Sequence, residues 1–162
     1  MSKAIDSLVV TRAAPADIPS LVALMQDFYA ESGHVLEPDA ARAAFVRLIG
    51  KPALGAVWIA HIGDVPVGHV VLVTRFAMEH GALAGCVDDL FVKADHRRSG
   101  VGGALLGALL AECAARQCRS LHVEVGGDNV AARALYARFG LQLAQDGRVL
   151  MLELSLVLTL ML

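Results

Sequence analysis

The feature that most constrains this chain is a basic, glycine-rich turn at residues 97–103, with the sequence Arg-Arg-Ser-Gly-Val-Gly-Gly. It stands between an alternating segment at 87–92, typical of a strand, and an apolar segment at 104–110, typical of a helix. Glycines let backbone N–H groups close on an anion, and a helix begins with the positive end of its dipole. The turn therefore predicts a strand-turn-helix unit that binds phosphate.

Two common nucleotide-binding turns do not fit this segment. A P-loop ends in Gly-Lys followed by Ser or Thr, and the chain contains no such step. The dinucleotide-binding motif needs a third glycine three residues after the second, where this chain has Leu105 after Gly102. A P-loop site is therefore excluded, and a nicotinamide-dependent enzyme is disfavoured.

A second segment, residues 129–141, predicts a capped helix that lines a site. Asn129 is a suitable N-cap, and Gly140 ends the helix through a left-handed C-cap. Asn129, Ala132, Arg133 and Tyr136 are spaced at i, i+3, i+4 and i+7, so their side chains share one helix face.

Together the two segments resemble the acyl-CoA N-acyltransferases of the GNAT superfamily, with the motif pattern of spermidine/spermine N-acetyltransferases. Arg97, Gly100 and Gly102 match the family's Arg-x-x-Gly-x-Gly run. Residues 129–141 are similar to its Asn-x-x-Ala-x-x-Leu-Tyr-x-x-x-Gly-Phe helix, with Leu141 in place of Phe. The resemblance covers nearly the whole chain and implies that acetyl-CoA is the cofactor and that an amine attacks it directly in a ternary complex.

The resemblance also implies which residues bind the cofactor. Backbone amides of residues 98–103 would take the coenzyme A pyrophosphate, and the backbone of residues 90–92 would pair with the pantetheine arm as an added strand. The amide of Val92 would polarise the thioester carbonyl. The full expected set is Leu90, Phe91, Val92, Arg97, Arg98, Ser99, Gly100, Val101, Gly102, Gly103, Asn129, Ala132 and Tyr136.

The chemistry requires a base and an acid. An amine with a pKa near 10 is protonated at pH 7, and removing that proton costs about 4 kcal/mol. Asp88 and Asp89 point to opposite faces in a regular strand, and Asp88, where relatives carry an acidic base, is the favoured base, with Asp89, Glu124 or a water chain as alternatives. Tyr136 is the expected acid for the departing thiolate, by proton transfer or by a hydrogen bond to sulfur.

The acceptor is expected to be a small-molecule primary amine. Substrate-binding residues are expected at Tyr29, Glu31, Asp89 and Glu124. A cationic acceptor is favoured by the carboxylates of Glu31, Glu37, Glu79, Asp88 and Asp89. A polyamine, an amino acid, an aminoglycoside and a protein N-terminus all remain open as acceptors. The alternatives are a protein N-terminal or lysine acetyltransferase and a non-catalytic module that binds acyl-CoA.

The element pattern predicts one α+β domain over residues 1–162, an α/β/α sandwich in the order βααβββαβαββ. Its central sheet is expected to be mixed and mostly antiparallel, with six or seven strands and four helices. The expected strands are 8–12, 57–61, 67–76, 86–92 and 121–125, followed by two around Asp146-Gly147, and the expected helices are 17–30, 40–49, 101–116 and one around Tyr136.

Composition excludes several classes of function. A net charge of −2 argues against nucleic-acid binding, and the six histidines lack metal-ligand spacing, so no metal is predicted. Three separate cysteines and a start without the pattern of a signal peptide predict a cytoplasmic protein with reduced thiols. Cys86 has no evident histidine partner, so it is not expected to carry an acyl group.

The last segment has leucine at every second position from Leu150 to Leu162. A strand would place these seven side chains on one face, whereas the run is too short and too polar for a membrane span. We expect a partner subunit to cover them, and therefore a homodimer that involves the C-terminal strand.

Overall fold

A computed structural model describes residues 7–126, 128–143 and 149–153 of the chain. Its elements follow the predicted order βααβββαβαββ, with two short 3-10 turns between them. The elements are β1 (Leu8–Arg12), α1 (Ile18–Glu31), α2 (Pro38–Gly50), β2 (Gly55–Ile62), β3 (Val65–Ala77), β4 (Ala82–Val92), α3 (Val101–Ala115), β5 (Ser120–Glu124), α4 (Val130–Arg138), β6 (Gln142–Leu143) and β7 (Val149–Glu153).

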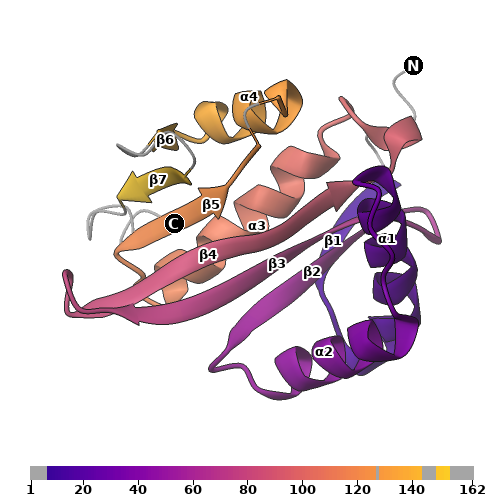
Figure 1. The fold of residues 1–162 in the computed structure, drawn as a ribbon, viewed down its shortest axis with the longest axis horizontal. Helices are drawn as coiled ribbons and strands as arrows, with labels where there is room; N and C mark the ends of the chain where they lie inside the picture. The colour runs from indigo at the N-terminus through magenta and orange to yellow at the C-terminus, as the bar shows by residue number, and fades with distance from the viewer. Residues whose placement is uncertain (1–6, 127, 144–148, 154–162) are drawn as a thin grey trace.

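The described strands form one seven-stranded sheet in the order β1-β2-β3-β4-β5-β7-β6. Every neighbouring pair is antiparallel except β4 and β5, which run parallel with α3 as their crossover. Helices α1 and α2 cover one face of the sheet, and α3 covers the other (Figure 1). The predicted mixed, mostly antiparallel α+β sandwich is therefore confirmed.

Each face of the sheet has its own buried core. Helix α3 is apolar around most of its surface, and its Leu105, Leu106 and Leu109 are fully buried against the sheet. On the other face, Leu21 of α1 and Phe45 of α2 pack over β2 and β3. Each fully buried apolar side chain stabilises the fold by roughly 1.5–3 kcal/mol, so these two cores hold the three layers together.

The predicted and observed bounds differ most notably in β4, which begins at Ala82 rather than at the predicted Cys86. Its first residues, Ala-Leu-Ala-Gly, have little intrinsic strand preference. They become a strand because they pair with β3, as in Phe76↔Leu83 and Arg75↔Ala84. Tertiary pairing therefore extends β4 beyond what the local sequence predicts.

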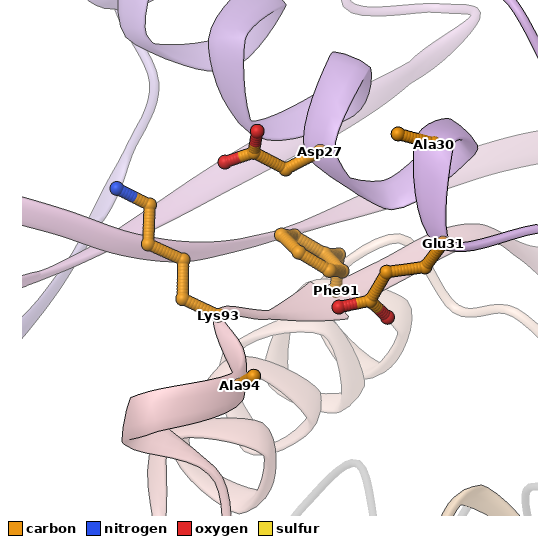
Figure 2. A pocket seen from close by; sticks show the side chains of 6 residues that line it. All are labelled: Asp27, Ala30, Glu31, Phe91, Lys93 and Ala94. Atoms are coloured by element: carbon orange, nitrogen blue, oxygen red, sulfur yellow. The ribbon is translucent and has the colours of Figure 1, made fainter.

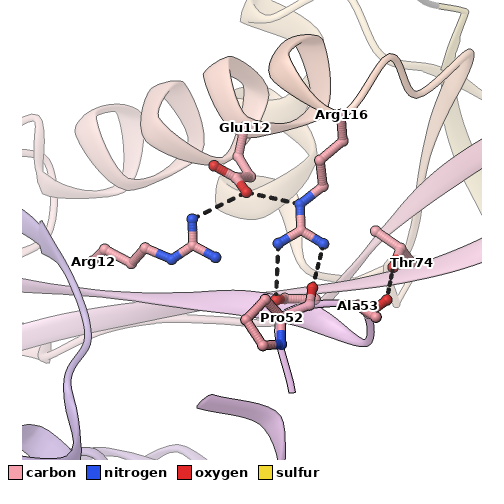
Figure 3. Close-up of polar contacts among 7 residues, drawn as sticks. Arg12, Pro52, Ala53, Thr74, Glu112 and Arg116 are labelled. Carbon is pink, nitrogen blue, oxygen red and sulfur yellow. Dashed lines mark hydrogen bonds and ion pairs between the residues drawn. The ribbon is translucent and has the colours of Figure 1, made fainter. Parts of the chain in front are cut away.

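Polar contacts fix the C-terminal end of α3 against β1 and the start of β2 (Figure 3). The Arg116 guanidinium donates to Glu112 at 2.7 Å and to the carbonyls of Pro52 and Gly55 at 2.6 and 3.1 Å. Arg12 of β1 donates to the same Glu112 carboxylate at 3.1 Å. These contacts hold the C-terminal end of α3, while its N-terminus follows the end of β4 along the chain.

The C-terminal strand prediction can be compared with the structure only in part. Strands β6 and β7 stand on either side of Asp146-Gly147 in the sequence, as predicted, and β7 lies between β5 and β6 in the sheet. Residues 144–148 and 154–162, which include Leu154–Leu162, lie outside the described residues. Within the described part of the chain, none of the helices has the length and apolar character that crossing a bilayer requires.

Candidate active site

A break in the sheet between β4 and β5 defines the site. The parallel pairing of these strands ends at Val87↔Val123. Beyond it, residues 88–92 of β4 have no partner on the β5 side among the described residues, and we call this edge the β4 gap. Unpaired backbone groups at a strand edge are a template for another extended chain.

The backbone of β4 alternates in what it presents to the β4 gap. The amide of Lys93 donates to the carbonyl of Val67 at 2.8 Å, which makes Gly68↔Val92 a non-hydrogen-bonded pair of the antiparallel ladder. The N–H and C=O groups of Val92, and by the same alternation those of Leu90, therefore point away from β3 and toward the gap. The amide and carbonyl of Phe91 point instead toward His69 of β3. Of the three backbone positions expected to pair with pantetheine, Leu90 and Val92 face the β4 gap, whereas Phe91 faces β3.

The predicted phosphate-binding turn lies directly after the β4 gap. Arg98 and Gly100 have positive φ angles of 59° and 87°, and Gly100 is the N-cap of α3. Within the described part of the chain, no backbone carbonyl accepts from the amides of residues 98–100. The first amides of α3, at residues 101–103, lack intrahelical acceptors because they open the helix. We call residues 98–103 the cradle, since consecutive free amides at a helix N-terminus form an anion site.

Three residues of the cradle determine how it closes and how it packs on α4. The Ser99 hydroxyl donates to the carbonyl of His96 and so closes the turn internally. A Cβ added at Gly102 would lie 3.1 Å from Leu135 Cδ2 of α4, so this glycine lets α4 pack closely on α3. A Cβ added at Gly103 would lie 3.9 Å from the ring of Phe139. The glycines therefore connect the cradle to the helix that carries Tyr136.

Helix α4 has the predicted caps. The Asn129 side chain accepts from the amide of Ala132 at 3.2 Å, and Gly140 has a φ of 89°. Tyr136 is 3% exposed and lies in the same buried cluster as Val87 and Val123, where the pairing of β4 and β5 ends. Burial raises the pKa of the Tyr136 phenol above its usual value of 10, so the phenol keeps its proton at neutral pH.

A β-bulge in β4 separates the two aspartates. Val71 pairs with Asp89 and Leu72 pairs with Val87, so Asp88 is an extra residue without a partner on β3. Cross-strand partners share a face, which places Asp89 on the α1 and α2 side with Val71, opposite to Val87. The regular alternation behind the opposite-face prediction for Asp88 and Asp89 therefore fails at this point of the strand.

The two carboxylates differ in environment. Asp88 is exposed, whereas Asp89 is 8% exposed. Burial, with a smaller contribution from the nearby charge of Asp88, raises the pKa of Asp89 to about 6. Burial and the charges of Asp89 and Asp88 also raise the pKa of the Tyr29 phenol in α1. The structure thus brings Tyr29 and both aspartates together, while Glu124 is exposed at the end of β5.

Arg97 does not project into the cradle. Its Nη2 lies 2.7 and 2.6 Å from the two carboxylate oxygens of Glu31, and its Nε donates to the carbonyl of Val92 at 2.8 Å. Its guanidinium carbon also lies over the Phe91 ring, 5.7 Å from the centroid. Arg97, expected to bind the cofactor, and Glu31, expected to bind the acceptor, are thus paired with each other in this structure.

A shallow pocket of about 420 Å³ lies between α1 and the end of β4 (Figure 2). The side chains lining it come from α1 and from the residues around the end of β4, and they are Asp27, Ala30, Glu31, Phe91, Lys93 and Ala94. It lies on the same side of the sheet as Tyr29 and Asp89. The pocket therefore marks an entrance to the site from the α1 face.

Two features of this region were not visible from the sequence. His69 is completely buried, between the rings of Phe45 and Phe91, and neither ring nitrogen has a partner. Burial lowers the pKa of His69 to about 4. His122 is the β5 partner of Cys86, although no sequence motif links them. Burial raises the pKa of the Cys86 thiol, which keeps it protonated and a poor nucleophile.

Comparison with known proteins identifies the fold and the class. The model of the acetyltransferase (GNAT) family matches residues 19–141, so the chain belongs to this family. It is an acyltransferase whose cofactor is acetyl-CoA. A search of curated proteins finds no match.

Solved structures show the same fold. An integron cassette protein from the mobile metagenome of Cole Harbour Salt Marsh is 38% identical, with 88% of this chain and 87% of that chain covered and a TM-score of 0.78. A Salmonella typhimurium protein solved with its cofactor acetyl-CoA is 14% identical, with 92% and 95% covered and a TM-score of 0.76. A ribosomal-protein-alanine N-acetyltransferase from Brucella melitensis is 18% identical, with 90% and 99% covered and a TM-score of 0.76. The last two are similar to this chain in fold alone.

Proposed function

We propose that this enzyme transfers an acetyl group from acetyl-CoA to a primary amine of a small cationic molecule, by direct attack in a ternary complex. The observation that carries the proposal is the position of the β4 gap, which runs from the free amides of the cradle to the buried carboxylate of Asp89. These features offer a phosphate site, an edge for an extended arm and a base along one continuous path.

The cofactor side of the proposal rests on backbone groups. The amides of residues 98–103 would hold the pyrophosphate, and the gap-facing groups of Leu90 and Val92 would hold the pantetheine arm. Arg97 Nε donates a hydrogen bond to the carbonyl of Val92. The backbone amide of Val92 remains to polarise the thioester carbonyl. Bound acetyl-CoA would supply the electrophilic carbonyl and the thiolate leaving group.

For the base, the bulge changes the preference between the two aspartates. The sequence favours Asp88, but the buried carboxylate of Asp89, with its pKa near 6, is better matched to proton transfer at neutral pH. In our proposal Asp89 accepts the amine proton. The charge of Asp88 raises the proton affinity of Asp89 and attracts the cationic acceptor.

Tyr136 is the proposed donor to the departing thiolate. Its raised pKa makes complete proton transfer to a thiolate, whose ordinary pKa is about 8.5, uphill by more than about 2 kcal/mol. The phenol would therefore stabilise the thiolate by a hydrogen bond while keeping its own proton. Tyr136 lies in the core of the α3 face and Asp89 on the opposite face, so acid and base would act from opposite sides of the sheet.

The acceptor is proposed to enter from the α1 face. Tyr29, Asp89, Asp88 and Glu124 would surround its amine, and the pocket between α1 and β4 would take the rest of the molecule. Because Glu31 is neutralised by Arg97, its role is to position α1 rather than to bind the amine.

Two alternatives remain as outcomes of the test. A protein N-terminal or lysine acetyltransferase would use the same cofactor site, and a non-catalytic module would bind acyl-CoA without turnover. The raised pKa of Asp89 favours an enzyme over a binding module. A carboxyl group with a pKa near 6 suits proton transfer at neutral pH, which a module that only binds acyl-CoA does not need. We further propose that the protein is cytoplasmic and homodimeric, on the basis of its three free thiols and its alternating C-terminal leucines.

The proposal is tested by incubating the protein with acetyl-CoA and panels of small amines and N-terminal peptides while free thiol is followed. Thiol release with a cationic small amine, and acetylation of that amine by mass, would support the proposal. Release with peptides alone would indicate the protein acetyltransferase. Tight binding of coenzyme A without release in any panel would indicate the binding module.

A further inference from the structure

The C-terminal end of α3 brings together two cysteines that the proposed function does not use. Cys113 lies in the last turn of α3 and Cys118 follows the helix, and they are 0% and 3% exposed. The amide of Cys118 donates to the carbonyl of Cys113 at 2.9 Å, and the amide of Gln117 donates to Ala114 at 3.0 Å. Gln117 has a φ of 58°, the left-handed conformation that commonly ends a helix.

This hydrogen-bond pattern is the Schellman motif, which places Cys113 and Cys118 side by side. An apolar contact usually occupies these two positions, and here two thiols do. The two buried thiols interact with each other, and this interaction shifts their pKa values in opposite directions. Because the backbones are already held together by the motif, side-chain rotation can bring the sulfurs to bonding distance without movement of the helix.

The two thiols differ in acidity. The interaction with the Cys113 thiol, together with the positive charge of Arg116, lowers the pKa of Cys118. The same interaction and burial raise the pKa of Cys113. Cys118 is therefore the more acidic thiol of the pair and Cys113 the less acidic one, the division of roles found in oxidation-sensitive cysteine pairs.

We propose that Cys113 and Cys118 are a reversible oxidation site, which forms an intramolecular disulfide with hydrogen peroxide as the oxidant. The Cys118 thiolate attacks one peroxide oxygen, the O–O bond breaks and, with one proton, water leaves, so that a sulfenic acid forms. The Cys113 sulfur then attacks the Cys118 sulfur, the S–O bond breaks, and a second water leaves with the thiol proton. Two thiols are oxidised to one disulfide and one peroxide is reduced to two waters.

Access comes from the end of the helix. Helix ends fray, and opening of the last turn at the exposed Gln117 uncovers Cys118 first. The sulfur of Cys113 also lies against β4, since a Cβ added at Gly85 would be 3.0 Å from it. Oxidation of Cys113 therefore acts on a sulfur that lies at the contact between α3 and β4.

The test uses the full-length protein, a small excess of hydrogen peroxide, alkylation of the remaining thiols and mass spectrometry. We expect the intact mass to fall by two hydrogen atoms, one alkylatable thiol to remain at Cys86, and a dithiol reductant to restore all three thiols. Peptide mapping should find residues 113 and 118 cross-linked. Three alkylatable thiols after peroxide treatment, or oxidation at Cys86 with the pair still reduced, would overturn the proposal.

Variants separate the two roles. Cys118→Ser should abolish the loss of two hydrogens, whereas Cys113→Ser should leave a sulfenic acid at Cys118 that a dimedone probe traps. Cys86→Ser is the matched control and should behave like the native protein. Trapping of Cys113 rather than Cys118 would contradict the assigned roles, and the mass of the native protein decides the proposal even where a variant fails to fold.

Discussion

Arg97 and Glu31 form a two-oxygen ion pair, with Arg97 Nη2 at 2.6 and 2.7 Å from the carboxylate oxygens, across 66 residues of sequence. The same guanidinium donates to the carbonyl of Val92 and lies over the ring of Phe91. One side chain thus connects the end of α1, on the proposed acceptor side, with the end of β4, on the proposed cofactor side. This relationship separates the two arginines of the turn, since Arg98 remains available to an anion.

The first prediction follows from that difference. Arg98→Gln should weaken coenzyme A binding about tenfold, whereas Arg97→Gln should change the Kd by less than threefold, as isothermal titration can measure. Arg97→Gln and Glu31→Gln should each reduce stability, with a coupling energy of about 0.5–1 kcal/mol in a double-mutant cycle, as expected for an exposed pair. Equal loss of coenzyme A affinity in the two arginine variants would show that Arg97 contacts the phosphate after all.

The second prediction concerns the base. The plot of log kcat/KM against pH should bend near pH 6 and fall tenfold per unit below it, as Asp89 becomes protonated. Asp89→Asn should lower kcat by about a hundredfold or more and remove this bend. Asp88→Asn, the adjacent control, should retain most of kcat and move the bend to lower pH, because the neighbouring negative charge is lost. A larger loss of kcat in Asp88→Asn than in Asp89→Asn would return the role to Asp88.

The third prediction concerns the acid. Tyr136→Phe removes one hydroxyl from a well-packed position, so the fold and the Kd for coenzyme A should change little. The rate of thiol release should fall about tenfold or more, because the departing thiolate loses its hydrogen-bond donor. An unchanged rate would mean that Tyr136 is only a core residue.

The fourth prediction compares two glycines of the same helical unit. Gly100 has a φ of 87°, whereas Gly107 lies in the middle of α3 with nothing within 4 Å of an added Cβ. Gly100→Ala should destabilise the protein by about 1 kcal/mol and weaken coenzyme A binding, because an alanine is strained in the left-handed conformation that the turn requires at this position. Gly107→Ala should stabilise the protein by about 0.5–1 kcal/mol and leave binding unchanged. Thermal unfolding and titration of the pair measure both effects.

The fifth prediction concerns stability against pH, where two buried groups act in opposite directions. His69 has a folded pKa of about 4 against 6.5 in the free side chain, so the unfolded chain binds a proton first and stability is lost as the pH falls from about 6.5 to 4. Asp89 has a folded pKa of about 6 against 3.8, so the folded chain binds a proton first and stability is gained as the pH falls from about 6 to 3.8. Each contribution is about 3 kcal/mol, and in the native protein they largely cancel.

Single variants should reveal each slope. His69→Phe should remove the loss, so that this variant gains stability as the pH falls through 6. Asp89→Asn should remove the gain, so that this variant loses stability over the same range. Urea unfolding at pH 7, 6, 5 and 4 measures the free energy of unfolding for each protein. Parallel curves for the two variants would contradict the assignment.

Local features of the site could be predicted from the sequence. The Asn129 N-cap and the Gly140 C-cap depend on neighbours within one turn, and the structure has both of them. The element order also follows from local periodicity. In contrast, the bulge at Asp88 depends on the register with β3, and no local pattern in the sequence marks it.

Contacts over long sequence separation were not predictable. Nothing near Arg97 shows that Glu31 will pair with it, because their meeting depends on how α1 packs on the sheet. The burial of His69 between two aromatic rings likewise arises only when α2 and β4 close around β3. The sequence therefore predicted the helices, strands and helix caps around the site better than it predicted the contacts between its residues.

The most direct test of this account is a crystal structure of the protein with coenzyme A bound. We predict the pyrophosphate on the amides of residues 98–103, the pantetheine arm along Leu90 and Val92 in the β4 gap, and the sulfur within hydrogen-bond reach of the Tyr136 hydroxyl. A cofactor bound elsewhere, or a paired β4 edge with Tyr136 sealed away from the sulfur, would contradict the account.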